Sequence, residues 1–338
     1  SFCCWLSYYS LKPSGIPEEV SENEFSVGKA FQHVEKIGDS PHYLGSAAHS
    51  SVRNYIVNEL QKLGLEVQTQ EDFVLNDAAI LSRPQNILTR IKGSGNGDAL
   101  VLMTHYDSQP HSSHGASDAG SGVATILEGL RAFIAEGNPP KNDLIVLFTD
   151  AEEIGLMGAE LFVRQPSWAK DARLALNFEA RGSGGSSFML LETNAGNAKL
   201  IKAFKEAHVP YPTTNSLAYS VYKLLPNDTD LTVLRESGNI NGFNFAFIGD
   251  HFDYHTANDI PENLDLETLA HQGDYLMPLL HYFQDADLNL LNSDNDLLYF
   301  NLPFGQFVTY PFGWIMPMLI LAFILFFIAG IAETNRAP

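Results

Sequence analysis

The stretch Met103-Thr-His-Tyr-Asp-Ser108 decides the fold, because it marks the point where a buried strand gives way to polar side chains. The residues before it, Ala99-Leu-Val-Leu-Met103, form a continuous apolar run typical of a strand buried on both faces. The loop Gly115-Ala-Ser-Asp-Ala-Gly-Ser-Gly-Val123 follows shortly afterwards. His105 and Asp118 therefore lie beyond the carboxyl end of a strand, where open α/β sheets place their active sites.

Strand and helix patterns alternate along the rest of the chain. Apolar residues recur at helical spacing over Ser50 to Leu63 and over Leu266 to Phe283. Short apolar runs typical of buried strands cover Asp143 to Phe148 and Phe243 to Ile248. This alternation predicts an α/β fold, a three-layer α/β/α sandwich with a mostly parallel mixed central sheet, which we expect over residues 25–290.

Composition limits the classes of partner. A chain of 338 residues with 45% hydrophobic content can bury one large core. Its 40 acidic and 20 basic residues leave no basic stripe for phosphates, so we expect no nucleic-acid partner. An acidic surface suits cationic ligands such as peptide N-termini, although solubility alone also explains the charge. The cysteines are adjacent, Cys3 and Cys4, which excludes a disulfide or thiolate metal site in the core.

The C-terminal region predicts a membrane anchor. Residues 314–332 are apolar throughout and long enough to cross a bilayer as a helix, so membrane lipid is an expected partner. A hydrophobic core helix is the alternative. The preceding residues 291–313 are rich in aromatic side chains, as in a juxtamembrane aromatic belt. Asp294 and Asp296 lie before the helix and Arg336 after it, which predicts a catalytic domain on the extracytoplasmic side.

The N-terminal segment, residues 1–24, begins with an aromatic stretch, Phe2-Cys-Cys-Trp-Leu-Ser-Tyr-Tyr9, that is too short to span a bilayer. We expect it to be the end of a trimmed anchor from a longer precursor.

Two motifs near the opening stretch have the chemistry of metal ligands. Zn²⁺ binds imidazole and carboxylate groups, and a catalytic site leaves one position for water. His105 and Asp107 form an H-x-D unit in which the carboxylate can orient the imidazole, although such units also occur as structural pairs. Asp118 lies among small residues that allow close backbone approach before a helix, where its alternative role is that of an N-cap.

Further acidic and histidine residues follow other predicted strands. Glu152 and Glu153 are adjacent just after the strand that ends at Phe148. Buried adjacent carboxylates are costly unless a cation or a proton compensates them, which favours a metal over a solvated pair. Glu179 and His255 come after two more strands. Because these strands belong to one sheet, we expect their ends to converge on a single metal site.

These motifs, taken in order, resemble metallopeptidase family twenty-eight, the co-catalytic di-zinc aminopeptidases, and especially its membrane-attached endoplasmic reticulum and vacuolar branch. The resemblance covers roughly residues 25 to 285 and includes Pro41-His-Tyr-Leu-Gly-Ser46 and Pro226-Asn-Asp-Thr-Asp230. It implies a membrane-anchored zinc metallopeptidase with two Zn²⁺ ions, peptide substrates and the zinc aminopeptidase fold.

The resemblance also implies a ligand set. His105 and Glu179 would bind one zinc ion, Glu153 and His255 the other, and Asp118 would bridge them. The three carboxylates and one bridging hydroxide neutralise two Zn²⁺ ions, which reduces the cost of burial. Many family members have aspartate where this chain has Glu179, and the longer side chain can reach the same metal.

The remaining roles follow from the same resemblance. Asp107 would orient the first histidine, and Glu152 would be the general base that takes a proton from water and gives it to the leaving amine. Tyr254, beside a ligand, is a candidate donor to the oxyanion, with plain packing as the alternative. Two rival functions stay open: a glutaminyl cyclase-like zinc acyltransferase, and a non-catalytic receptor-like ectodomain of the same fold.

Overall fold

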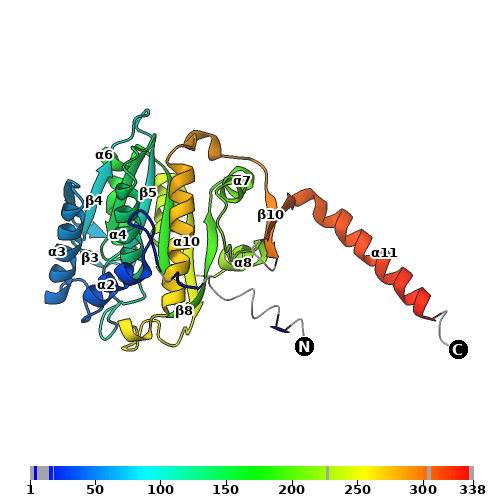
Figure 1. Cartoon of the computed structure of the whole chain (residues 1–338), viewed down its shortest axis with the longest axis horizontal. Helices are drawn as coiled ribbons and strands as arrows, with labels where there is room; N and C mark the ends of the chain where they lie inside the picture. The colour runs from blue at the N-terminus through cyan, green and yellow to red at the C-terminus, as the bar shows by residue number, and fades with distance from the viewer. Residues whose placement is uncertain (1–3, 6–14, 18, 226–227, 303–305, 335–338) are drawn as a thin grey trace.

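A seven-stranded mixed sheet forms the centre of the protein in the computed structural model (Figure 1). The structure describes residues 4–5, 15–17, 19–225, 228–302 and 306–334. The strand order is β1-β4-β6-β5-β7-β9-β8. The strands are β1 (Val67–Glu71), β4 (Gln85–Ile91), β5 (Ala99–His105), β6 (Asp143–Thr149), β7 (Ala172–Ala180), β8 (Gly184–Glu192) and β9 (Asn241–Gly249).

Strands β5, β6, β7 and β9 run parallel and occupy the middle of the sheet. Antiparallel strands flank them, with β1 and β4 on the β6 side and β8 on the β9 side. Strand β5 lies between β6 and β7. The next two strands along the chain therefore pair with opposite edges of β5. The carboxyl ends of the four parallel strands therefore meet around the end of β5, as the sequence predicted.

The apolar run of β5 packs on both faces of the sheet because successive side chains point to opposite sides. Leu100 and Leu102 join one cluster with helices on one face, and Val101 and Met103 join a second cluster on the other face. The first face is covered by α3 (Ala47–Lys62), α4 (Gly120–Ala135), α7 (Ala198–Glu206) and α10 (Leu266–Phe283). The second is covered by α5 (Met157–Arg164), α6 (Pro166–Ala169) and α9 (Asp230–Gly238). The expected three-layer α/β/α sandwich is confirmed.

Smaller elements complete this part of the chain. Helix α2 (Val27–Ile37) packs on α4 and α10, outside the first helical layer. Strands β2 (Val74–Leu75) and β3 (Leu81–Ser82) form a short hairpin. A further helix, α8 (Ser216–Tyr222), lies between α7 and α9 in the chain. The Asn215 side chain caps this helix by accepting a hydrogen bond from the Ala218 N–H, a signal readable in the sequence.

The aromatic segment before the C-terminal apolar helix packs partly on the domain. It forms a hairpin of β10 (Leu297–Leu302) and β11 (Gln306–Pro311). Tyr299 is only 1% exposed and belongs to the same hydrophobic cluster as the sheet. Phe307 lies against Phe204 of α7, with ring centroids 5.4 Å apart. These two aromatic residues therefore contribute to the core, and the packed region extends beyond the expected boundary at residue 290.

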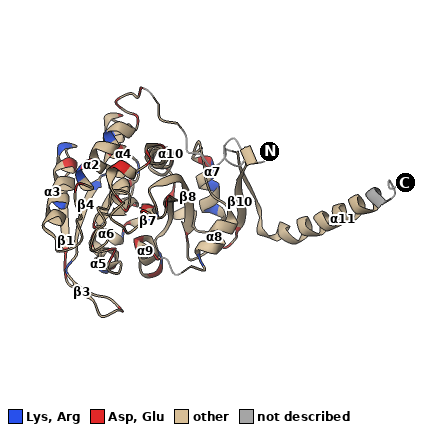
Figure 2. Ribbon diagram, turned by 90° about the horizontal axis from the view of Figure 1, so that it is seen from below, with Lys and Arg blue, Asp and Glu red and all other residues tan. Residues whose placement is uncertain are grey.

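Helix α11 (Ile315–Thr334) extends away from the domain (Figure 1). Among the described residues, Phe312–Ile331 is the one helical stretch long and apolar enough to cross a membrane. None of it is buried against the domain, which argues against the alternative of a core helix. Figure 2 shows it free of charged side chains as far as Ile331. Arg336, Cys3 and most of residues 1–14 lie outside the described residues.

The hairpin and the apolar helix make separable contributions, which two truncations test. A chain ending at residue 313 should leave the membrane fraction and keep the thermal stability of the domain, because the hairpin still covers the core. A chain ending at residue 296 should also leave the membrane but unfold at a temperature lower by roughly 5–15 °C, because Tyr299 is lost. Carbonate extraction and circular dichroism measure the two effects. Retention of the first variant in membranes would exclude α11 as the anchor.

Candidate metal centre

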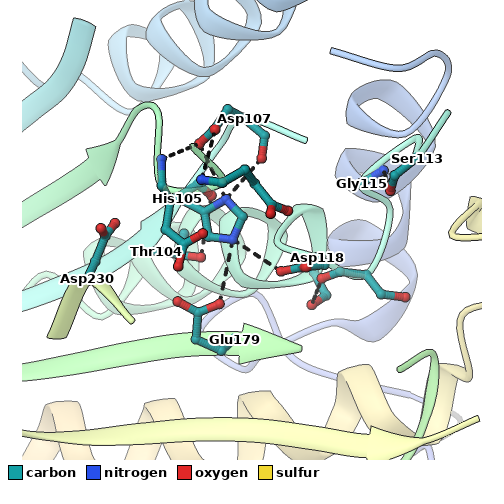
Figure 3. Close-up of polar contacts among 12 residues, drawn as sticks. Thr104, His105, Asp107, Ser113, Gly115, Asp118, Glu179 and Asp230 are labelled. Carbon is teal, nitrogen blue, oxygen red and sulfur yellow. Dashed lines mark hydrogen bonds and ion pairs between the residues drawn. The ribbon is translucent and has the colours of Figure 1, made fainter. Parts of the chain in front are cut away.

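The predicted site residues lie at the carboxyl ends of the parallel strands, and Figure 3 shows His105, Asp107, Asp118 and Glu179 close together there. His105 is the last residue of β5, and Glu179 is the penultimate residue of β7. Glu153 follows the end of β6, and His255 follows β9. Asp118 lies in the loop that leads into α4. Four strands thus deliver the five predicted metal ligands to one place.

The carboxylate of Asp118 divides these residues into two groups. Its Oδ1 atom lies 3.1 Å from His105 Nε2, and its Oδ2 atom lies 3.2 Å from His255 Nε2. His105 Nε2 is also 3.6 Å from Glu179 Oε2. His255 Nε2 is also 3.1 Å from Glu153 Oε2. Each group therefore has one histidine, one glutamate and one oxygen of the shared aspartate.

These separations match the edges of zinc coordination polyhedra. Ligand atoms at about 2.0–2.1 Å from a tetrahedral Zn²⁺ lie about 3.3 Å from one another. The four nitrogen-to-oxygen distances of 3.1–3.6 Å fall around that value. Potential ligand atoms of His105, Asp118 and Glu153 also lie within 4.8 Å of one another. The spacing therefore fits the coordination of a metal cation by these residues.

The electrostatics of the cluster favour cations in the same places. Burial lowers the pKa of His105, but the nearby carboxylates of Asp107, Asp118 and Glu179 outweigh it and raise that pKa well above its usual value. Burial also opposes the charge of His255, and Asp118 and Glu153 raise its pKa to about 9. The two histidines in turn outweigh burial at Asp118 and lower its pKa to about 2. The site thus draws positive charge to both imidazoles.

The pKa values of the neighbouring glutamates, Glu152 and Glu153, are raised in this buried acidic cluster. Burial raises the pKa of Glu152 well above its usual value. Burial, and then the charge of Asp118, raise the pKa of Glu153 to about 7. The Oε1 atom of Glu153 is buried and has no hydrogen-bond partner among the described residues. A bound cation would satisfy this oxygen and stabilise the charged carboxylates, so the donor set fits zinc.

Asp107 has a double role that the H-x-D spacing did not reveal. Its backbone carbonyl accepts a hydrogen bond from His105 Nδ1 at 2.9 Å, which leaves Nε2 to face the other ligands. Its carboxylate lies 3.5 Å from the same nitrogen. That carboxylate also accepts the backbone N–H groups of Glu152 and Glu153, at 3.1 and 3.3 Å. Asp107 therefore positions a histidine and both glutamates together.

Asp259 holds the loop of Asp118 in the same manner, a role that was not predicted from the sequence. It is buried, and its carboxylate accepts the N–H groups of Ser117 at 2.7 Å and Asp118 at 3.3 Å. Burial and the charge of Asp118 raise its pKa to about 6. Its position four residues after His255 was the available signal. Two aspartates thus fix the loops that carry the bridging and acidic residues.

Asp230 is a second residue that the sequence left without a role, although it ends the Pro226–Asp230 motif. It is fully buried at the start of α9, where the Thr149 hydroxyl donates to its Oδ2 atom. Burial raises its pKa to about 7. Its charge also adds to the effect of burial in raising the pKa of Glu152. Asp230 therefore helps to favour the protonated form of that glutamate.

The alternative role of Asp118 as a helix cap is wrong. The N-cap of α4 is Ala119, and no side chain caps it. The small residues around Asp118 allow the expected close approach of the backbone. A Cβ on Gly122 would lie 2.4 Å from the Thr104 hydroxyl and 2.6 Å from the Phe178 carbonyl. The helix therefore approaches β5 and β7 closely, which brings Asp118 over the strand ends.

Tyr254 lies against the cluster and borders a cavity. Its ring stacks on His255 with centroids 3.7 Å apart. Burial raises its pKa, so the hydroxyl stays protonated and able to donate. A cavity of about 530 Å³ opens between Tyr254, the acidic cluster and α8. A volume of this size is in the range of small-ligand sites.

Comparison with known proteins places these features in a family. The model of peptidase family M28 matches residues 86–280. A vacuolar membrane protease of Candida dubliniensis is 30% identical over 92% of this chain. Endoplasmic reticulum metallopeptidase 1 of Rattus norvegicus is 27% identical over 94% of the chain. This chain spans 34% and 38% of the lengths of these two curated relatives.

Solved structures share the fold. A leucine aminopeptidase precursor from Bacteroides thetaiotaomicron is 21% identical and superposes with a TM-score of 0.61, covering 78% of this chain and 99% of its own. A glutaminyl cyclase from Porphyromonas gingivalis is 20% identical, with a TM-score of 0.62 and coverages of 76% and 98%. At these identities the likeness concerns the fold alone.

The Asp259 contact makes a prediction about metal affinity. Asn in place of Asp259 keeps the volume but offers one oxygen where two backbone N–H groups need acceptors. We expect Asp259→Asn to weaken zinc binding by roughly 10- to 100-fold, because the Asp118 loop is no longer fixed. Competition with a chelator measures this affinity. The control is Asp265→Asn, since Asp265 also accepts a backbone N–H group, that of Glu267, at 2.9 Å. Equal zinc affinity in both variants would contradict the role of Asp259.

Proposed function

Because the chain belongs to peptidase family M28, we propose that this zinc metallopeptidase is a membrane-anchored aminopeptidase that uses two zinc ions to hydrolyse N-terminal peptide bonds. The observation that carries the proposal is the division of the Asp118 carboxylate between two histidines. Its Oδ1 and Oδ2 atoms face His105 and His255 at 3.1 and 3.2 Å. A carboxylate with a histidine at each oxygen suits a bridge between two ions.

The proposed ligand sets follow the two groups of contacts. His105 and Glu179 would hold one ion, Glu153 and His255 would hold the other, and Asp118 would contribute to both. The resemblance to this family implies an aspartate at the position of Glu179 in many members, and the Glu179 Oε2 atom lies 3.6 Å from His105 Nε2. The longer side chain therefore reaches the same place. When bound, zinc lowers the pKa of water and polarises the scissile carbonyl.

Glu152 is the proposed general base. It borders the cavity, and burial raises its pKa, which favours a group that accepts a proton and then releases it. Its backbone N–H donates to the Asp107 carboxylate at 3.1 Å, which fixes its position. We assign it the proton of the attacking water and its transfer to the leaving amine. Tyr254 then donates a hydrogen bond to the oxyanion of the substrate.

The acidic groups also support action at a free N-terminus. Asp118, Glu152 and Glu179 all border the cavity. An ammonium group in this cavity would offset their charge, whereas an internal peptide bond brings no such cation. This difference favours exopeptidase over endopeptidase action.

The proposed location is a membrane of the secretory or vacuolar system. Relatives carry the names of vacuolar and endoplasmic reticulum membrane enzymes, and α11 is an apolar helix of suitable length. Acidic residues precede this helix, and Arg336 follows it. By the distribution of positive charge, the catalytic domain lies on the extracytoplasmic side.

The bridging position of Asp118 makes a prediction about metal content. Asp118→Ala should lose both zinc ions, because both groups contain one of its oxygens. His105→Ala and His255→Ala should each lose mainly one. Elemental analysis of purified protein counts the ions. His281→Ala is a matched control, since His281 pairs with Glu136 at 2.7 Å outside the cluster.

Retention of two zinc ions in all three site variants would exclude the proposed ligand sets. One zinc ion per wild-type chain, together with cyclisation of N-terminal glutamine, would favour the glutaminyl cyclase alternative. Full metal loading without any peptide hydrolysis would favour the receptor-like alternative.

The adjacent glutamates should respond differently to the same substitution. Glu152→Gln keeps the shape but cannot accept a proton, so we expect two bound zinc ions and a kcat lower by roughly 10²- to 10⁴-fold. Glu153→Gln should lose zinc first and activity as a consequence. Steady-state kinetics and metal analysis on the same samples separate these effects. Near-native kcat in Glu152→Gln would contradict its assignment as the base.

A further inference from the structure

Arg181 lies beside the acidic cluster but takes no part in it. It follows the end of β7, two residues after Glu179, and its backbone N–H donates to the Phe247 carbonyl at 2.8 Å. Its guanidinium carbon lies 5.5 Å from the centroid of the Tyr254 ring. It also lines the cavity of about 530 Å³. The guanidinium therefore places a positive charge at the edge of the candidate active site.

The guanidinium of Arg181 has no carboxylate partner among the described residues. Six other arginines in the described chain form ion pairs with Asp or Glu, namely Arg83, Arg90, Arg131, Arg164, Arg173 and Arg235. Arg181 remains without one although the chain has 40 acidic residues. Its contact with the Tyr254 ring occupies one face of the group and leaves N–H donors at its edge.

The lining of the cavity contains charges of both signs. Asp118, Glu152 and Glu179 border it at the proposed catalytic end. Arg181 is the only cation among its described lining residues. Much of the remaining wall is apolar and includes Phe188 of β8. Asp228 also lines the cavity, so a ligand that fills it meets several carboxylates but a single positive charge among the described lining residues.

Tyr254 contacts both His255 and Arg181, and this arrangement indicates which part of a substrate Arg181 could contact. The His255 ring stacks on Tyr254, with centroids 3.7 Å apart, and Arg181 contacts the same tyrosine. Arg181 thus lies one ring beyond a proposed zinc ligand. One residue beyond the scissile bond advances a peptide by about 3.8 Å. The terminal carboxylate of a dipeptide therefore lies one residue beyond the reacting carbonyl, and Arg181 is the cation among the described lining residues that can meet it.

We propose that Arg181 binds a carboxylate of the substrate one residue beyond the scissile bond, which makes short peptides with a free C-terminus preferred substrates. This inference rests on the proposed peptidase function and adds a specificity subsite to it. The planar guanidinium suits paired hydrogen bonds to a carboxylate. The same chemistry accepts the side chain of Asp or Glu at that position, so the substrate carboxylate has two possible sources.

The first experiment compares two peptides that differ only in this charge. L-leucyl-L-alanine has the carboxylate, and L-leucyl-L-alaninamide lacks it. With the zinc-loaded full chain we expect kcat/KM to be higher for the acid by roughly 10- to 100-fold. Arg181→Gln should bring this ratio close to one while kcat/KM for the amide stays within about twofold. Arg181→Lys should retain part of the ratio, because it keeps the charge without the planar group.

A second pair of peptides identifies the source of the carboxylate. The two peptides are Leu-Asp-NH2, called the aspartamide, and Leu-Asn-NH2. Both have an amidated C-terminus, and only the first has a side-chain carboxylate. A preference for the aspartamide that disappears in Arg181→Gln assigns the side chain as an alternative source. Arg53→Gln is the matched control, since Arg53 also lacks a carboxylate partner among the described residues and does not line the cavity.

Equal kcat/KM for the acid and the amide in the wild type would overturn the subsite. So would a loss of activity in Arg181→Gln that affects both peptides alike, since a purely structural role predicts that result. If the wild type hydrolyses no peptide, the proposed function fails separately. Calorimetric binding of L-leucyl-L-alanine then decides the subsite: weaker binding in Arg181→Gln than in Arg53→Gln supports it, and equal binding refutes it.

Discussion

The site depends on the contacts of the Asp118 carboxylate, because its two oxygens face histidines that come from different strands. His105 ends β5 and His255 follows β9, and each lies close to one oxygen of Asp118. Buried carboxylates of this kind repel one another unless positive charge lies between them. The unpartnered oxygen of Glu153 is a consequence of the same arrangement. The cluster therefore has the properties of a site built around cations.

The β10–β11 hairpin contacts the wall of the cavity and also leads into the apolar helix α11. Helix α8, which lines the cavity, is held against β10 by a hydrogen bond from the Tyr299 N–H to the Ser216 hydroxyl at 2.8 Å. Asn215 and Phe300 form a β-bridge beside it. The β10–β11 hairpin then leads within a few residues to α11. The part of the protein that shapes the cavity is thus continuous with the apolar helix that could span a membrane.

The alternation of apolar runs and helical patterns was sufficient to predict the layers and the location of the site. The run from Ala99 to Met103 is buried on both faces, as its composition requires. His105, Glu153 and Glu179 lie at strand ends because the carboxyl ends of parallel strands meet at one edge. The apolar stretch of α11 was equally readable, since length and composition alone determine whether a helix can span a bilayer.

Only the tertiary structure decided which atoms face one another. The sequence predicted Asp118 near His105. The position of His255 at the second oxygen of Asp118 depends on the order of strands in the sheet, in which β7 lies beside β5 and β9 lies beside β7. The contact of Asp259 with the Asp118 loop and the burial of Tyr299 depend on the same non-local packing. Sequence periodicity reports which face of an element is buried, because that face repeats within a few residues. It carries no information about which distant element covers that face, since strand order and side-chain pairing are set only when the whole sheet forms.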